Sequence, residues 1–219
     1  MSNIANMKKS EILERHFFRC VHGHTGLEHK NCFDQKNGLD KKIGFIDIES
    51  SNLKATYGIV FSYCIKELNG NIIKNAVTPK ELKEGNYDKR LMEDFCNDAR
   101  KFDRLIGYYS SIFDIPFLRS RCIYHHLDFP VYKEIKHTDL YMMIRNRFNM
   151  HSKRLGAVCE FFGIESKEHP MTSHVWFRAM QGQQDALKYI LKHNEEDVIS
   201  TETLYKRVCN YSRITDTSI

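Results

Sequence analysis

The chain has 219 residues, of which 42% are apolar and 28% are charged, a composition typical of a globular protein with one substantial domain. No apolar run approaches the ~20 residues of a membrane span, and the N-terminus lacks a signal-peptide pattern, so we expect a cytoplasmic protein with no membrane partner. The formal net charge of +5 permits nucleic-acid binding without requiring it.

The first part of the chain predicts one helix and a three-stranded meander. Residues 7–19 are amphipathic and predict a helix, and the polar stretch 34–42 predicts a linker. Strands are predicted over 42–49, 57–66 and 72–77. Asn69-Gly70-Asn71, between the last two strands, is a strong hairpin signal.

In the rest of the chain, helices alternate with short strands. Helices are predicted over 87–102, 114–125, 154–162 and 184–208, and strands over 105–109 and 135–140. Pro116 is tolerated in the first turn of its helix, and Gly163 fits the position just after a helix end. The segment with His174, Trp176 and Phe177 receives no role. The order βββ-α-β-α-β-α-α predicts a mixed α/β layer fold.

Four acidic residues lie beside or inside apolar runs: Asp47, Glu49, Asp114 and Asp197. Asp47 and Glu49 are two residues apart on a predicted strand, so both point to the same face. Carboxylates so close together in an apolar frame are costly to bury, and a divalent cation such as Mg²⁺ is the usual compensation. Convergence of such acids from different elements is typical of two-metal phosphoryl-transfer sites.

His193 precedes Asp197 by four residues, so the two side chains share a helix face. A neutral imidazole there would take a proton from, or orient, an attacking water. Each motif also has an ordinary explanation, such as Asp114 capping a helix or residues 195–197 forming a solvated face. Together, in this order, they favour a metal-binding active site. Asp139 also follows a strand, and we expect a structural role for it.

The three acidic contexts resemble the three motifs of the DEDD (DnaQ-like) 3′→5′ exonucleases. They are Phe45-Ile-Asp47-Ile-Glu49, Gly107-Tyr-Tyr-Ser-Ser-Ile-Phe-Asp114-Ile-Pro-Phe-Leu118 and His193-Asn-Glu-Glu-Asp197-Val198. The resemblance covers about residues 43–209 and is strongest to a branch of stand-alone, predicted exonucleases. It implies that Asp47, Glu49, Asp114 and Asp197 bind two Mg²⁺ or Mn²⁺ ions.

The resemblance also implies a ribonuclease H-like fold, a mixed five-stranded sheet flanked by helices. This domain is expected over residues 41–211, after an N-terminal helix and zinc-binding element over 1–40 and before a tail over 212–219. The third motif of the family is Tyr-x3-Asp or His-x4-Asp, whereas this chain has His193-x3-Asp197. His193 therefore either positions water, as the tyrosine does, or acts as a base.

Five potential zinc ligands fall within thirteen residues: Cys20, His22, His24, His29 and Cys32. Structural zinc takes four N or S ligands, so we expect four of these five to bind one Zn²⁺. Cys20, His29 and Cys32 are expected in the set, and His22 and His24 compete for the fourth place. The alternative is a histidine-rich linker with reduced thiols, which an odd number of scattered cysteines also allows.

Basic and aromatic residues flank the acidic motifs. A basic stretch comprises Arg145, Arg147, His151, Lys153 and Arg154, which either follow phosphates or form a solvated loop. Tyr108, Tyr109 and Phe113 either stack on a terminal base or pack in the core.

The sequence thus predicts an enzyme, a two-metal 3′→5′ exonuclease that acts on DNA or RNA and releases nucleoside monophosphates. Its expected partner is the 3′ end of a nucleic acid. One alternative is a non-catalytic ribonuclease H-like module whose zinc element binds nucleic acid or protein. The other is a related metal-dependent endonuclease.

Overall fold

The computed structural model describes residues 9–29, 32–33, 42–165, 171–211 and 217–219. The chain divides into two units, Met1–Lys41 and Lys42–Ile219. In the first unit, α1 spans Lys9–Phe17, within the predicted helix. Residues 7–8 of that helix and 34–41 of the predicted linker lie outside the described residues.

The second unit is built on a six-stranded mixed sheet with the order β3-β2-β1-β4-β5-β6. The strands are β1 (Ile43–Ser50), β2 (Val60–Glu67), β3 (Ile72–Ala76), β4 (Arg104–Gly107), β5 (Lys136–Asp139) and β6 (Thr217–Ser218). β1 pairs with β2 antiparallel and with β4 parallel, so it lies in the middle of the sheet. The predicted mixed sheet is therefore confirmed.

The predicted number of five strands was wrong, because β6 pairs antiparallel with β5 as a sixth strand. β6 has only two residues, too few to show an alternating pattern, and it lies in the stretch predicted as a tail. The predicted hairpin is confirmed: Gly70 N–H donates to the carbonyl of Glu67 at 2.9 Å, and Asn69 takes a positive φ of 56°.

The described part of the second unit has seven α-helices, which alternate with strands after β3, and a short 3₁₀ turn at Cys209–Tyr211. They are α3 (Pro79–Glu84), α4 (Lys89–Ala99), α5 (Asp114–Tyr124), α6 (Leu140–Arg147), α7 (Leu155–Phe161), α8 (Ser173–Met180) and α9 (Gln184–Val208). The four predicted helices are present as α4, α5, α7 and α9. Gly163 has a φ of +63° just after α7, as the sequence predicts. Among the described residues, no helix is both long and apolar enough to cross a membrane.

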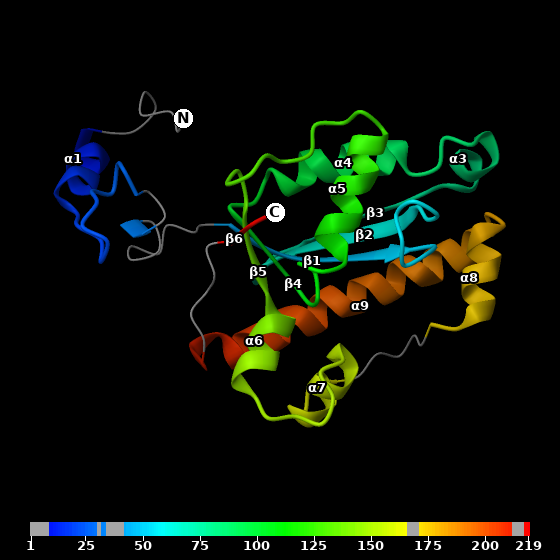
Figure 1. The fold of residues 1–219 in the computed structure, drawn as a ribbon. Coiled ribbons are helices and arrows are strands. Elements are labelled where there is room, and N and C mark those ends of the chain that lie inside the picture. The colour runs from blue at the N-terminus through cyan, green and yellow to red at the C-terminus, as the bar shows by residue number, and fades with distance from the viewer. Residues whose placement is uncertain (1–8, 30–31, 34–41, 166–170, 212–216) are drawn as a thin grey trace. The chain divides into compact units, whose positions relative to one another are not determined.

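The sheet is covered by helices on both faces, with α4 and α5 on one side and α9 on the other (Figure 1). β1 alternates between two apolar clusters, because successive strand residues point to opposite faces. Ile46 and Ile48 pack in the cluster that includes Phe95 of α4. Phe45 packs in the other cluster with Val198 of α9. The odd positions of β1 therefore face α9.

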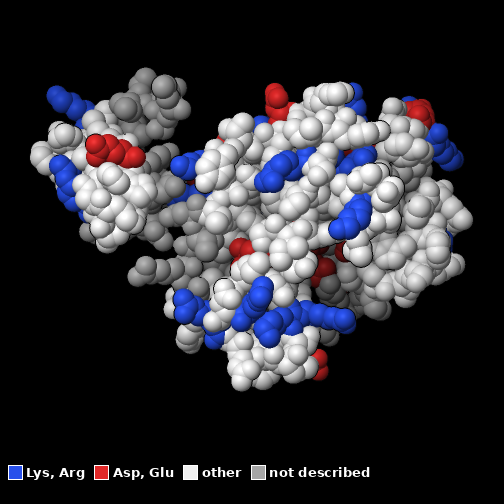
Figure 2. All heavy atoms as spheres, viewed as in Figure 1, with Lys and Arg blue, Asp and Glu red and all other residues white. Residues whose placement is uncertain are grey.

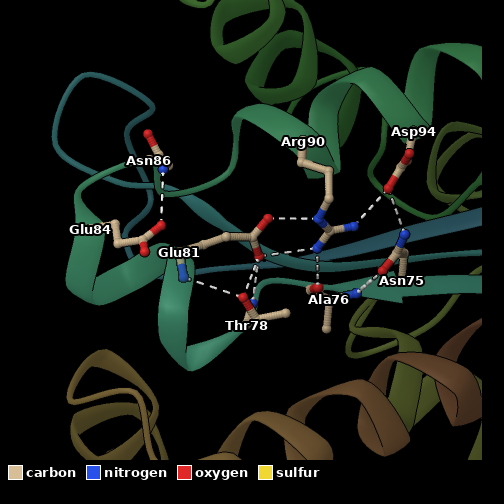
Figure 3. Close-up of polar contacts among 8 residues, drawn as sticks. All are labelled: Asn75, Ala76, Thr78, Glu81, Glu84, Asn86, Arg90 and Asp94. Carbon is tan, nitrogen blue, oxygen red and sulfur yellow. Dashed lines mark hydrogen bonds and ion pairs between the residues drawn. The ribbon is translucent and has the colours of Figure 1, made fainter.

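A polar network holds α3 and α4 to the edge strand β3 (Figure 3). The Arg90 guanidinium of α4 donates to the Glu81 carboxylate at 2.6 Å, to Asp94 at 2.6 Å and to the carbonyl of Ala76 at 2.8 Å. Thr78 and Glu81 form a reciprocal capping box at the start of α3. These contacts fix the outer corner of the sheet.

A second network is buried between α4, α5 and β2. The fully buried carboxylate of Asp88 accepts two hydrogen bonds from Arg121, at 2.6 and 2.9 Å, and one from the Val60 N–H at 2.9 Å. His125 Nε2 lies 2.7 Å from the same carboxylate. Burial would raise the pKa of Asp88, but Arg121, the Val60 N–H and His125 together hold it below its usual range. The network fastens the start of α4 to α5.

The long helix α9 is anchored at its C-terminal half to the β2–β3 hairpin. Glu202 accepts a hydrogen bond from the Asn69 N–H at 2.7 Å and forms ion pairs with Lys66 at 3.0 Å and Lys206 at 2.8 Å. Burial would raise the pKa of Glu202, but Lys206, the Asn69 N–H and Lys66 lower it overall. This anchor sets the register of α9 against the sheet.

Candidate functional site

The acidic pair of β1 faces α9 from the centre of the sheet. Asp47 and Glu49 occupy the odd positions that point away from the cluster of Ile46 and Ile48. The Asn194 amide of α9 donates to Asp47 Oδ2 at 2.8 Å. The same-face prediction for the pair is thus matched by contacts to one helix.

Glu49, His193 and Asp197 form a compact group with one ligand atom each, all within 4.8 Å of one another. His193 Nε2 lies 3.6 Å from Glu49 Oε1 and 3.6 Å from Asp197 Oδ2. Asp197 and His193 are buried, so this imidazole lies between two largely desolvated carboxylates. The predicted shared face of His193 and Asp197 has the i,i+4 geometry of α9.

Asp114 approaches the same strand from the first turn of α5. Its Oδ1 accepts a hydrogen bond from the Ile48 N–H at 3.1 Å, between the two acids of β1. Burial raises the pKa of Asp114 to about 7, and the charges of Asp139 and Asp197 add to the rise, while backbone N–H groups oppose it. Its carboxylate, like that of Asp47, lies outside the group of described ligand atoms within 4.8 Å.

Asp139 offers a contrast, because its carboxylate is saturated by hydrogen bonds. Its Oδ1 accepts from the Tyr109 and Tyr141 N–H groups at 2.9 Å, and its Oδ2 accepts from the Ser111 N–H at 2.9 Å and from the Ser111 hydroxyl. It also caps α6, which begins directly after β5. These contacts fit the structural role predicted for Asp139.

The hydrogen bonds to Asp139 also fix the conformation of the loop between β4 and α5. Tyr109 takes a φ of +62°, an uncommon conformation for a tyrosine, while its N–H is held by Asp139. Ser110 lies so close to Gly107 that a Cβ at that position would come within 2.4 Å of the serine side chain. The loop that leads into Asp114 is therefore tightly determined.

An aromatic and basic pocket of about 650 Å³ opens beside this loop. Its lining residues are Tyr108, Tyr109, Tyr141, His151, Ser152, Lys153, Arg154 and Leu155. The rings of Tyr109 and Tyr141 meet edge to face at 4.8 Å. The Tyr108 hydroxyl donates to the carbonyl of Lys153 at 2.6 Å and so ties the basic segment to the loop. The pocket joins two sets of residues that are separate in the sequence.

A second pocket of about 320 Å³ borders Glu49 itself. Phe113 and Trp176 supply its aromatic lining, and residues 50–53, which follow Glu49, complete it. Trp176 belongs to α8 and stacks on Phe61 of β2, with ring centroids 5.8 Å apart. The pocket therefore gives Trp176 a place at the site that the sequence did not assign.

Basic side chains surround the acidic groups on this face of the unit. Figure 2 shows Lys and Arg gathered over α6 and α7 and over α5, with acidic atoms visible between the two groups. Arg145, Arg147 and Arg154 are exposed on the α6–α7 side, and Arg119 is exposed on α5. Such an arrangement attracts a polyanion toward a centre that itself favours cations.

In the first unit, four of the five predicted zinc ligands converge. They are Cys20, His22, His29 and Cys32, each with one ligand atom within 4.8 Å of the others. His24 is outside this group, so of the two competing histidines the structure brings His22 to the cysteines.

Sequence reasoning missed two side chains of the site, Asn194 and Trp176. Asn194 adjoins His193 on α9 and is fully buried. A buried polar side chain needs a hydrogen-bond partner, but its burial is visible only in the structure. Trp176 is the single tryptophan of the chain, and its position ahead of the third motif was the available signal.

Residues 44–209 match the sequence profile of the RNase_H superfamily. The structure of the family B DNA polymerase from the hyperthermophilic archaeon Pyrobaculum calidifontis is similar to this chain, with a TM-score of 0.64 and 19% sequence identity. The similarity covers 77% of this chain and 24% of that one, so the chain spans about a quarter of the polymerase and shares its fold there. No curated protein sequence matches the chain.

Proposed function

Because the chain belongs to the RNase H superfamily, we propose that it is a metal-dependent 3′→5′ exonuclease of the DEDD type. It hydrolyses phosphodiester bonds at the 3′ end of DNA or RNA and releases nucleoside monophosphates. The observation that carries the proposal is the convergence of Glu49, His193 and Asp197 within 4.8 Å, from a central strand and the helix packed on it. Superfamily membership alone would not distinguish a nuclease from a binding module.

The carboxylates suit two divalent cations of the Mg²⁺ or Mn²⁺ class. Their oxygen atoms are the hard ligands that these ions prefer. Burial, with a smaller contribution from the charges of Asp139 and Asp197, raises the pKa of Asp114 to about 7, and a bound divalent cation is the charge that would favour its ionised form. Asp47, Glu49, Asp114 and Asp197 would hold the ions, which supply an activated water and stabilise the leaving oxygen.

The chain's own groups then orient the reactants. His193, which faces Glu49 and Asp197 at 3.6 Å, takes or directs the proton of the attacking water. Asn194 holds Asp47 in place through its hydrogen bond at 2.8 Å. The Ile48 N–H holds Asp114 in the same way, so the second and first motifs keep a fixed separation.

The pockets on this face suit a single-stranded 3′ end. Phe113 and Trp176 provide aromatic surfaces next to Glu49, and base–aromatic stacking tolerates any sequence. Lys153 and Arg154 provide cations for phosphates beside Tyr109. The similarity to part of a DNA polymerase is in keeping with a nucleic-acid substrate.

The second cofactor predicted from the sequence, a structural Zn²⁺, has its candidate ligands in the first unit.

The test is a degradation assay on 5′-labelled single-stranded DNA and RNA with Mg²⁺ or Mn²⁺. We expect stepwise shortening from the 3′ end and release of nucleoside monophosphates. Asp47→Asn should abolish both. Asp128→Asn, the same chemical change at an exposed position, serves as the matched control and should retain full activity.

Two outcomes would contradict the proposal. Internal cleavage of circular DNA would identify an endonuclease. Tight binding of oligonucleotides with no cleavage under any metal would identify a non-catalytic module.

A further inference from the structure

The Cys/His cluster of the first unit has the interatomic distances of a metal site. Cys20 Sγ lies 3.4 Å from His29 Nδ1 and 3.8 Å from His22 Nδ1, and Cys32 Sγ lies 3.9 Å from His22 Nδ1. Tetrahedral zinc, with Zn–S near 2.3 Å and Zn–N near 2.0 Å, separates its sulfur and nitrogen ligands by about 3.5 Å. Both histidines direct the same ring nitrogen, Nδ1, at the sulfurs.

The backbone of the segment builds the turn that such a site needs. Gly23 takes a φ of +81°, and its N–H donates to the carbonyl of Cys20 at 2.9 Å. The Cys20 N–H donates to the carbonyl of His24 at 3.0 Å, and Arg19 pairs with Thr25 in an isolated β-bridge. This tight reversal brings His22 back over Cys20.

A second turn carries the other half of the cluster. Thr25 and Glu28 exchange hydrogen bonds in the manner of a helix cap, with Thr25 N–H to the carboxylate at 2.8 Å and Glu28 N–H to the hydroxyl at 3.2 Å. The His29 N–H then donates to the carbonyl of Thr25 at 2.8 Å, and Cys32 N–H to the carbonyl of His29 at 3.2 Å. The ligands thus come from two turns that are defined by backbone hydrogen bonds, without any contribution from the ligand side chains.

The described part of this unit buries little apolar surface. Cys20 and Phe33 are the buried apolar side chains among its described residues, while Phe17 and Val21 are largely exposed. Units of this size need a staple in addition to their core, and metal binding supplies folding free energy outright. One of the two buried apolar side chains is itself a candidate ligand.

We propose that Cys20, His22, His29 and Cys32 bind one Zn²⁺ in a closed tetrahedral site that stabilises the fold of the first unit. Two thiolates and two imidazoles favour zinc over the hard cations suited to carboxylates. Four protein ligands fill a tetrahedron, so the role is structural. His24 contacts the His29 ring edge to face at 5.5 Å and lies outside the ligand set.

The test uses the full chain, loaded with Zn²⁺, dialysed and analysed by elemental mass spectrometry. We expect about one zinc per chain in the wild type and in His24→Gln, and ~0.1 or less in Cys20→Ser and His22→Gln. His24→Gln is the matched control, since it removes a histidine from the same turn. Zinc retained by His22→Gln, or lost from His24→Gln, would overturn the assignment.

Two further measurements separate binding from folding. Substitution by Co²⁺ should give thiolate charge-transfer and tetrahedral absorption bands, and their absence from the wild type would contradict the ligand set. Removal of zinc should abolish amide-exchange protection in residues 9–29 and leave residues 42–165 protected. Protection of residues 9–29 that survives zinc removal would overturn the structural role. Neither readout depends on nuclease activity.

Discussion

The two units of this chain use potential metal ligands in opposite ways. In the first unit, the Cys/His cluster stands where a core would be, since Cys20 is one of two buried apolar side chains among its described residues. In the second unit, two apolar clusters on either face of the sheet support the carboxylates, which are not needed to fill space. Loss of a Cys or His ligand should therefore unfold the first unit, whereas loss of a carboxylate should inactivate the second unit without unfolding it.

The carboxylates of the second unit are a local cost that its core can bear. Asp114 is buried among like charges and would stabilise the fold more as a neutral group. The carboxylate of Asp88 is buried as well, but it stabilises the fold as a charged group, because Arg121 and His125 form ion pairs with it. The same residue type thus serves function at one position and stability at another.

The largest effect that tests this contrast is expected for Asp114→Asn. We predict a loss of activity of ~10³-fold or more, because metal-bound groups supply several kcal/mol of transition-state stabilisation. The free energy of unfolding without divalent metal should be unchanged or higher, as measured by urea titration. A marked loss of stability would show that the acid is structural and would remove the distinction from the first unit.

Asp88→Asn should do the reverse. Breaking a buried ion pair leaves the Arg121 guanidinium uncompensated, and we predict a loss of about 3–5 kcal/mol in the free energy of unfolding. At a temperature where the variant is folded, its activity per folded molecule should equal that of the wild type. Asp128→Asn is again the control, with a change within about 0.5 kcal/mol.

His193→Gln should reduce the rate by ~10²-fold with little change in stability, because general-base or water-orienting groups contribute roughly this much. His193→Tyr distinguishes the two roles, since a phenol with an ordinary pKa of about 10 can hydrogen-bond to water but does not act as a base at neutral pH. Substantial activity in His193→Tyr, measured by nucleotide release, indicates positioning. Activity equal to that of His193→Gln indicates a base.

The last effect concerns the stability of the fold in acid. Burial lowers the pKa of His137 from its ordinary 6.5 to about 4, so the unfolded chain binds this proton more tightly than the folded chain. Stability is therefore complete above about pH 6.5 and declines as the pH falls toward 4, by about 3 kcal/mol at most.

His137→Gln should flatten this decline in urea titrations between pH 7.5 and 5, whereas the exposed His151→Gln should not. Identical pH slopes for the wild type and His137→Gln would show that other groups govern acid stability.

Motif spacing and periodicity predicted the order of the main elements and the acids that meet at β1. They could not predict α6, because Asp139 ends β5 and caps the next helix with no loop between to mark the boundary. The sequence also did not predict α8, because its eight residues give only two turns of periodicity. The contact of its Trp176 with Phe61 of β2 depends on tertiary packing.

Contacts that depend on tertiary packing were equally beyond the sequence. The sequence does not distinguish His22 from His24 as a metal ligand, whereas the turn at Gly23 brings His22 to the cysteines. Asn194 reads as one polar residue of a helix, and its bond to Asp47 appears only when α9 is packed on the sheet. The pocket of Tyr109 and Lys153 likewise joins segments about forty residues apart.

The anchoring of α9 makes its length part of the chemistry. Glu202 is tied to the β2–β3 hairpin, and Asp197 and His193 face Glu49 from farther along the same rigid rod. One residue inserted between Asp197 and Glu202 would turn one half by about 100° and advance it by about 1.5 Å, so the two attachments could not both survive. The helix thus fixes both the distance and the rotation between its anchor and the acidic site. An insertion that alters no side chain would be as damaging as the loss of an acid.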